Sequence, residues 1–198
     1  MEKFHPLSNL DRYQVILASG SPRRKELLEL LDIAFSVDTS HSVDETVPSD
    51  VAVDSIPAYL SKLKAEAYPL SAGDNKLVIT ADTVVILDGK LLGKPKSREG
   101  AIEMLNLLQG RTQRVVTGVT IRTAAGCETW SAESEVEFAE LTCEEIEYYI
   151  DKYQPLDKAG AYGIQEWIGA AAISGIRGSF YNVMGLPVHR LYNALKKY

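Results

Sequence analysis

The sequence has few cysteines and histidines and no long apolar segment. Its 198 residues include two cysteines, Cys127 and Cys143, and three scattered histidines. Neither set has the spacing of a zinc site or of a CxxC redox pair, so we expect both thiols to be free and buried. No apolar run approaches the roughly 18 residues of a transmembrane helix, and the first residues lack signal-peptide and transit-peptide features. We therefore expect a cytoplasmic protein without a membrane partner.

Positive charge is also in short supply. The chain has 21 Lys and Arg against 27 Asp and Glu, which gives a net charge of −6. Such a protein repels the backbone of a nucleic acid, so we expect no nucleic-acid partner. Any anion that it binds must meet a local cluster of basic residues. At 45% hydrophobic and 24% charged residues, the composition is that of a globular protein, which excludes disorder and a coiled coil.

The order of the expected elements predicts an α/β protein with a mixed twisted sheet and flanking helices. Apolar runs rich in β-branched residues predict strands, and apolar residues at helical spacing predict helices. Thr142 and Glu145 form a capping box at one helix start. Two long segments predict an antiparallel ribbon with one solvent-exposed face. The expected strands are 13–18, 77–87, 90–92, 113–123, 128–138 and 170–176, and the expected helices begin near 22, 57, 97, 142 and 187.

The first candidate site is the basic turn around Ser19 and Ser21. Arg23, Arg24 and Lys25 follow at an expected helix N-terminus, where the helix dipole makes positive charge unfavourable unless an anion offsets it. The backbone N–H groups of the turn, its two hydroxyls and its guanidinium groups would together bind a phosphate. The alternative interpretation is a solvated basic patch at an ordinary helix start.

The second candidate site centres on Asp82, which lies in the middle of a strongly β-forming apolar run. A buried carboxylate is costly unless it is paired or binds a metal, so Asp82 is a candidate metal ligand or general base. The alternative is a strand-end aspartate bonded to backbone N–H groups. Lys64 and Lys94 would add cations, and Asp44 or Glu45 a second carboxylate if their loop folds over the site. Such a set suits divalent-metal-assisted attack on a phosphate ester.

The third candidate site is the segment Leu156–Gln165, which is rich in small residues. Small residues let the backbone approach a flat ligand, and the Gln165 amide offers a donor and an acceptor for a base edge. The alternative is a tight glycine-rich loop without a ligand. The chain contains no P-loop, GxGxxG or GxSxG motif, so the common NTPase, dehydrogenase and hydrolase templates are excluded.

Five segments resemble the Maf family of nucleoside triphosphate pyrophosphatases. They are LASGSPRRKELL (17–28), ADTVV (81–85), GKP (93–95), LDKAGAYGIQ (156–165) and GSFYNVMGLPV (178–188). The AGAYGIQ segment is similar to the dTTP/UTP branch. The resemblance implies hydrolysis of dTTP, UTP or modified pyrimidine nucleotides to the monophosphate and pyrophosphate, by metal-assisted attack of water at the α-phosphorus.

The resemblance also implies an architecture and a setting. It implies a fold similar to inosine triphosphate pyrophosphatases, with two lobes around a deep cleft. A polar lead over residues 1–12 would precede one nucleotide pyrophosphatase domain over 13–198. The expected cofactor is a divalent cation, Mg²⁺ or Mn²⁺, and the expected assembly a cytoplasmic homodimer. Because the family is linked to septum formation, the alternative is a non-catalytic nucleotide-binding regulator of cell division, which would have no use for Asp82.

The resemblance assigns roles to individual positions. Asp82 matches the proton acceptor, although whether it acts as base or metal ligand stays open. In this chain Glu166 and Trp167 follow Gln165, where the family usually has glycine, so the base pocket could be reshaped and Glu166 could accept from the amino group of cytosine. The expected catalytic residues are Asp82, Lys94, Glu45 and Lys64, of which Asp82 and Glu45 would hold the metal. The expected substrate-binding residues are Ser19, Arg23, Arg24, Thr83, Asp157, Lys158 and Gln165, of which Arg23, Thr83 and Gln165 match positions that govern substrate choice.

Overall fold

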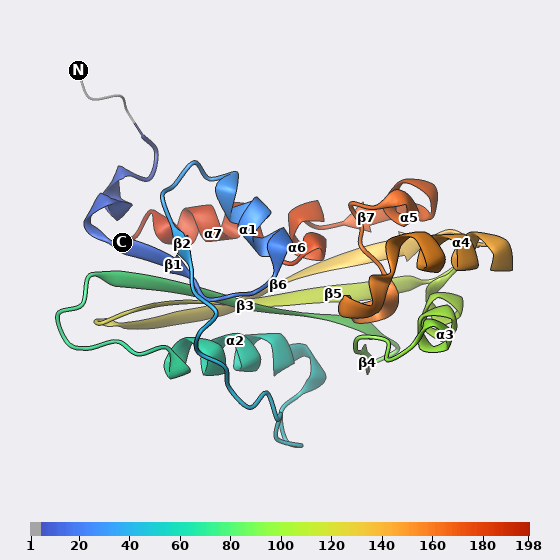
Figure 1. The fold of residues 1–198 in the computed structure, drawn as a ribbon, viewed down its shortest axis with the longest axis horizontal. Helices are drawn as coiled ribbons and strands as arrows, with labels where there is room; N and C mark the ends of the chain where they lie inside the picture. Colours follow the sequence, from blue (N-terminus) through green and yellow to red (C-terminus); the bar gives the residue numbers. More distant parts are fainter. Residues whose placement is uncertain (1–4) are drawn as a thin grey trace. The chain divides into compact units, whose positions relative to one another are not determined.

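The computed structural model, drawn in Figure 1, describes residues 5–198. These residues form two compact units. Unit 1 takes in the chain up to Asp82, together with Gly118–Ser131 and Gly185–Tyr198. Unit 2 consists of Thr83–Thr117 and Ala132–Met184. Three long strands contribute residues to both units: β3 (Lys76–Leu87), β5 (Thr112–Thr123) and β6 (Gly126–Phe138).

The strands form one mixed sheet, which confirms the expected α/β class. Over the described residues it has seven strands in the order β2-β1-β3-β5-β6-β7, with β4 paired to β3. Parallel pairing joins β1 (Gln14–Leu17) to β2 (Ser36–Val37) and to β3. Antiparallel pairing joins β3 to β4 (Lys90–Leu92), and β6 to β7 (Ile173–Arg177).

Unit 1 places helices on both faces of its strands. Figure 1 shows α2 (Ile56–Ala67) on one side, and α1 (Pro22–Glu29) and α7 (Val188–Leu195) on the other. Each helix buries apolar residues, Leu28 of α1, Leu60 of α2 and Leu195 of α7 among them. Two 3-10 turns, η1 (Ser8–Arg12) and η2 (Val53–Ser55), complete the unit.

Unit 2 packs its helices around one apolar core. The core includes Val85 of β3, Val136 of β6, and residues of α3 (Arg98–Leu108) and α4 (Cys143–Tyr153). The capping box that begins α4 is present, as predicted. Between α4 and β7 the chain forms two 3-10 turns, η3 (Pro155–Asp157) and η4 (Ala159–Ala161), and helix α5 (Trp167–Ala171). Helix α6 (Phe180–Met184) follows β7.

Several expectations about burial were wrong. Cys127 and Cys143 are free but exposed, because Cys127 is the second residue of β6 and Cys143 the first residue of α4, at element ends that are not packed inward. Strand β5 is buried on both faces from Val115 to Ile121, and in unit 1 helices cover both faces of the sheet, so the ribbon lacks the expected exposed face there. Within the expected polar lead, Leu7 and Leu10 are buried, and residues 1–4 lie outside the described part of the chain.

The length and the hydropathy of a helix decide whether it can cross a membrane. Over residues 5–198, none of the helices combines the length and the apolar character that crossing a bilayer requires.

Candidate functional site

The basic turn of unit 1 has the predicted strand, turn and helix order. Strand β1 ends at Leu17 and α1 begins at Pro22, with Ser21 in the N-cap position. Ser19 Oγ accepts hydrogen bonds from the Ser21 backbone N–H and from the Arg24 guanidinium, both at 3.3 Å. The Ser21 side chain makes no capping hydrogen bond to α1 within the described residues. The helix N-terminus therefore keeps the partial positive charge that favours an anion.

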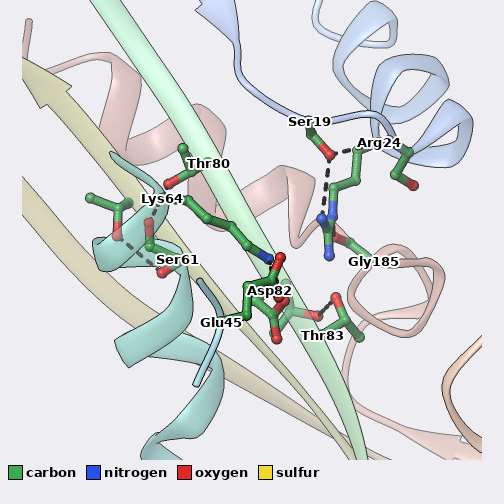
Figure 2. A network of polar contacts seen from close by, with 12 residues as sticks. Ser19, Arg24, Glu45, Ser61, Lys64, Thr80, Asp82, Thr83 and Gly185 are labelled. Atoms are coloured by element: carbon green, nitrogen blue, oxygen red, sulfur yellow. Dashed lines mark hydrogen bonds and ion pairs between the residues drawn. The ribbon is translucent and has the colours of Figure 1, made fainter. Parts of the chain in front are cut away.

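Arg24 is held in a fixed orientation inside unit 1. Its Nε donates to the Gly185 carbonyl oxygen at 2.9 Å, in addition to the contact with Ser19 (Figure 2). Desolvation lowers the pKa of Arg24, an effect that the carboxylates of Asp82 and Glu45 oppose. An arginine stays protonated at neutral pH even so. Arg24 is thus an oriented, partly desolvated cation within electrostatic range of two carboxylates.

Lys64 lies between those two carboxylates. Its Nζ is 2.8 Å from Asp82 Oδ1 and 3.1 Å from Glu45 Oε2. Lys64 comes from α2, Asp82 from β3, and Glu45 from the loop between β2 and η2, as Figure 2 shows. Asp82 is therefore paired with an ammonium group, as a carboxylate within an apolar strand must be. The side chains of Asp82 and Lys64 are 15% and 21% exposed, so water reaches both.

Buried hydroxyl groups fix α2 against the sheet and so place Lys64. Thr80 Oγ1 donates to the Ser61 carbonyl oxygen at 2.6 Å, and the Ser61 hydroxyl is 3.0 Å from Thr120 Oγ1. Thr80 and Asp82 are two residues apart on β3, so both face α2, and Ser61 and Lys64 are three apart on α2, so both face β3. Ser61 and Thr80 were not among the expected site residues. The signal that could have identified them is a hydroxyl residue at a position where the helix or strand pattern calls for an apolar one.

Gly118 of β5 allows the close approach of α2. A Cβ atom at this position would lie 2.2 Å from the carbonyl carbon and oxygen of Pro57, the second residue of α2. Any side chain here would push the N-terminal end of α2 away from the strand, so glycine is required for packing rather than for backbone conformation.

The donor set of unit 1 fits a metal ion only together with a substrate. Asp82 and Glu45 supply two carboxylates, and over residues 5–198 no group of three or more His, Cys, Asp and Glu side chains is arranged to hold a metal. Mg²⁺ is commonly bound by one or two carboxylates plus substrate phosphates and water. The residues present therefore fit a metal that arrives with a phosphate ligand, and not a permanent protein-only metal site.

Apart from Arg23, the remaining expected site residues lie in unit 2. Thr83 Oγ1 lies 3.0 Å from Thr117 Oγ1, which donates to the Asn182 carbonyl oxygen. Lys94 is exposed in the segment after β4. Gln165 is exposed in the turn between η4 and α5. In unit 1, Arg23 is half-buried on α1.

Lys158 is buried and already engaged by acidic side chains. Its Nζ is 2.9 Å from Asp157 Oδ1 and 3.2 Å from Glu166 Oε1. The second carboxylate oxygen of Glu166 accepts from the Tyr149 hydroxyl, which in turn accepts from the Gly163 N–H. Both carboxylate oxygens of Glu166 thus have partners within unit 2, whereas the sequence had suggested that this carboxylate could accept from the amino group of cytosine.

The chain is similar to one protein family and to several named relatives. A family model described as Maf-like protein matches residues 14–198. A protein of Bacteroides thetaiotaomicron named dTTP/UTP pyrophosphatase is 56% identical over 191 residues, which cover 96% of this chain and 99% of the relative. Proteins of the same name from Porphyromonas gingivalis and Phocaeicola vulgatus are 54% and 52% identical, over 97% and 96% of this chain and 98% and 99% of theirs.

A solved structure supports the fold. A HAM1 protein from Coxiella burnetii aligns with a TM-score of 0.50 and 14% identity, over 94% of this chain and 100% of that one. At this identity the likeness concerns the fold alone. The sequence matches, in contrast, run through every segment that supplies the basic turn, Asp82 and the Gln165 turn. On that ground the chain belongs to the Maf family.

Proposed function

We propose that this protein hydrolyses nucleoside triphosphates, UTP and dTTP foremost, to the monophosphate and pyrophosphate. Relatives that are 49–56% identical over nearly their whole length are named dTTP/UTP pyrophosphatase. The observation that carries the proposal is the contact of Lys64 with both Asp82 and Glu45 in unit 1. A protein that only binds a nucleotide needs the basic turn but gains nothing from two carboxylates held near it. The cluster thus favours an enzyme over a non-catalytic regulator.

The side chains of unit 1 suit attack of water at the α-phosphorus. The water oxygen forms a bond to phosphorus, the bridging bond to the β-phosphate breaks, and pyrophosphate leaves with the electron pair. Asp82 orients the water and accepts its proton, which requires an ionised carboxylate. Arg24 and Lys64 stabilise the negative charge that develops on the phosphate oxygens. A divalent cation held by Asp82 and Glu45, when bound, would supply further charge neutralisation.

The other expected residues keep the roles that the family resemblance implies. Ser19 would contact the phosphates beside Arg24, and Arg23 would take part in substrate choice. In unit 2, Lys94 would bind phosphate, Thr83 and Asp157 would contact the nucleotide, and Gln165 would read the base. A homodimer, a cytoplasmic location and one domain over residues 13–198 remain predictions of the resemblance.

The products released from a panel of nucleotides test this function. We expect pyrophosphate, and no orthophosphate, from UTP and dTTP in the presence of Mg²⁺ or Mn²⁺. An assay of both products, with and without inorganic pyrophosphatase, separates the two reactions. Release of single phosphates, or the absence of turnover with all common and modified nucleotides, would contradict the proposal.

Base selection provides a second prediction, which concerns Gln165. An amide held in one orientation accepts from N3–H and donates to O4 of uracil or thymine, whereas cytosine presents the opposite polarity at N3 and N4. A mismatch leaves polar groups unpaired, at a cost of about 1–3 kcal/mol each. We expect kcat/KM for UTP and dTTP to exceed that for CTP by about tenfold or more.

Replacing Gln165 by alanine should reduce that preference more than it reduces turnover of UTP. Gln14→Ala, which removes an exposed glutamine of β1, is the matched control. Kinetics with UTP, dTTP and CTP on the three proteins provide the measurement. A wild type that prefers CTP, or a preference that survives Gln165→Ala unchanged, refutes the role of Gln165.

A further inference from the structure

The carboxylate of Glu166 points into unit 2 rather than toward solvent. It contacts Lys158 Nζ at 3.2 Å and accepts a hydrogen bond from the Tyr149 hydroxyl. The side chains of Glu166 and Lys158 are 16% and 9% exposed. Two opposite charges that are this deeply buried stabilise each other, because removing one leaves the other buried without a charged partner.

Glu166 closes the turn that carries Gln165 through its backbone, and its carboxylate is linked to the same turn through the Tyr149 hydroxyl. The Glu166 N–H donates to the Gly163 carbonyl oxygen at 3.0 Å, and the Gly163 N–H donates to the Tyr149 hydroxyl at 3.0 Å. A Cβ atom at Gly163 would lie 2.8 Å from Glu166 Cδ. A Cβ atom at Gly169 would lie 1.7 Å from the Ile164 carbonyl oxygen. The turn is thus packed against the Glu166 side chain on one side and against α5 on the other.

Gln165 is the exposed residue between two anchored neighbours. Ile164 is 5% exposed and packs in the apolar core of unit 2, while Glu166 is held by Lys158 and Tyr149. Because the side chains of Ile164 and Glu166 are both held inside unit 2, the backbone at Gln165 is fixed between them. The Gln165 side-chain amide is therefore presented in one direction. Without the Glu166 anchor, the C-terminal half of the turn would lose its charged attachment to the unit.

We propose that Glu166 is a positioning residue for base selection, which it serves by holding the turn that presents Gln165. This inference rests on the proposed function, in which Gln165 reads the base. Lys158 then acts as the partner that keeps Glu166 in place, instead of contacting the nucleotide as the family resemblance implies. Glu166 itself does not bind the base, because both of its carboxylate oxygens have partners within unit 2.

The substitution Glu166→Gln tests the proposal. Glutamine keeps the size of the side chain and an acceptor for Tyr149 but removes the negative charge that faces Lys158. We expect the ratio of kcat/KM for UTP to that for CTP to fall about five- to tenfold, chiefly through a higher KM for UTP, with kcat within about twofold. Because both residues act through one turn, Gln165→Ala should lower the ratio no further in the Glu166→Gln background.

Glu147→Gln is the matched control, because Glu147 is an exposed glutamate of α4 that pairs with Arg98 in the same unit. It should leave the ratio unchanged. A Glu166→Gln protein with the wild-type ratio overturns the proposal. Equal losses for UTP and CTP also overturn it, since these would indicate general damage to the unit rather than a misdirected amide. Thermal denaturation of each variant identifies such damage.

A binding measurement separates this inference from the proposed function. Equilibrium dialysis of UTP and CTP in the presence of EDTA measures base preference without turnover. If wild type releases no pyrophosphate from any nucleotide, the proposed function fails. Glu166 is then judged by binding alone: a UTP preference that Glu166→Gln reduces supports the positioning role. No preference in wild type, or one that the substitution leaves intact, overturns it.

Discussion

Replacing Asp82 by asparagine is expected to lower kcat for UTP hydrolysis by about two orders of magnitude or more, as for the loss of a general base. Asparagine has the shape of aspartate, so the packing stays the same. It has no negative charge, so its contact with Lys64 is weaker. It cannot accept a proton from water, and it is a poor metal ligand. Binding of the nucleotide should persist, because Arg24 and the basic turn are untouched.

The measurement is steady-state release of pyrophosphate, together with equilibrium binding of UTP. Asp88→Asn is the matched control, since Asp88 follows β3 and is exposed, and asparagine tolerates its positive φ of 50°. We expect near wild-type kcat for this control. Near wild-type kcat for Asp82→Asn would disprove the assignment and make Glu45, the other carboxylate beside Lys64, the better candidate.

Local sequence signals predicted the elements that carry the site. The basic turn lies where Pro22 fits the first residue of a helix after a short apolar strand. Likewise, Thr142 and Glu145 satisfy each other's backbone N–H groups at the start of α4, as the capping box requires. These features depend on residues a few positions apart, so the sequence alone is sufficient to identify them.

Contacts between distant segments could not be predicted in the same way. The pairing of Lys64 with Asp82 and Glu45 requires α2 to pack closely on the sheet, which depends on Gly118, a residue 36 positions after Asp82 in the sequence. The composition of the strand indicated that Asp82 needs a partner but not which residue supplies it. The residues themselves made Lys64 and the Asp44–Glu45 pair candidates, and the family resemblance selected Glu45 from that pair.

The loop after α4 shows the opposite case, in which an unexpected residue has a structural reason. Periodicity gave no prediction for residues 154–169, because the turns η3 and η4 are only three residues long and include or adjoin left-handed residues, Gly160 and Gln154. From the sequence, Glu166 was a departure from the family pattern with a carboxylate that could accept from cytosine. In the structure it pairs with Lys158 and Tyr149, a contact that depends on Tyr149 lying on α4, 17 residues earlier.

Removal of divalent cations is expected to lower pyrophosphate release by about two orders of magnitude or more, since charge neutralisation by a metal contributes several kcal/mol to phosphoryl transfer. Excess EDTA in the assay, followed by addition of Mg²⁺ or Mn²⁺, measures this loss and its recovery. Full activity in excess EDTA would refute the metal requirement.

Glu45→Gln then tests whether the carboxylates beside Lys64 hold that metal. Glu45 is 52% exposed and shares the Lys64 ammonium with Asp82, so losing its charge should leave the fold intact. Because fewer charged ligands weaken binding of a hard cation, we expect half-maximal activity to require about tenfold more Mg²⁺, with most of kcat regained at saturation. Glu66→Gln, which removes an exposed glutamate of α2 paired with Lys62, is the matched control. If both variants require the same Mg²⁺ concentration as wild type, Glu45 does not hold the metal, and Asp82 with the substrate phosphates must hold it alone.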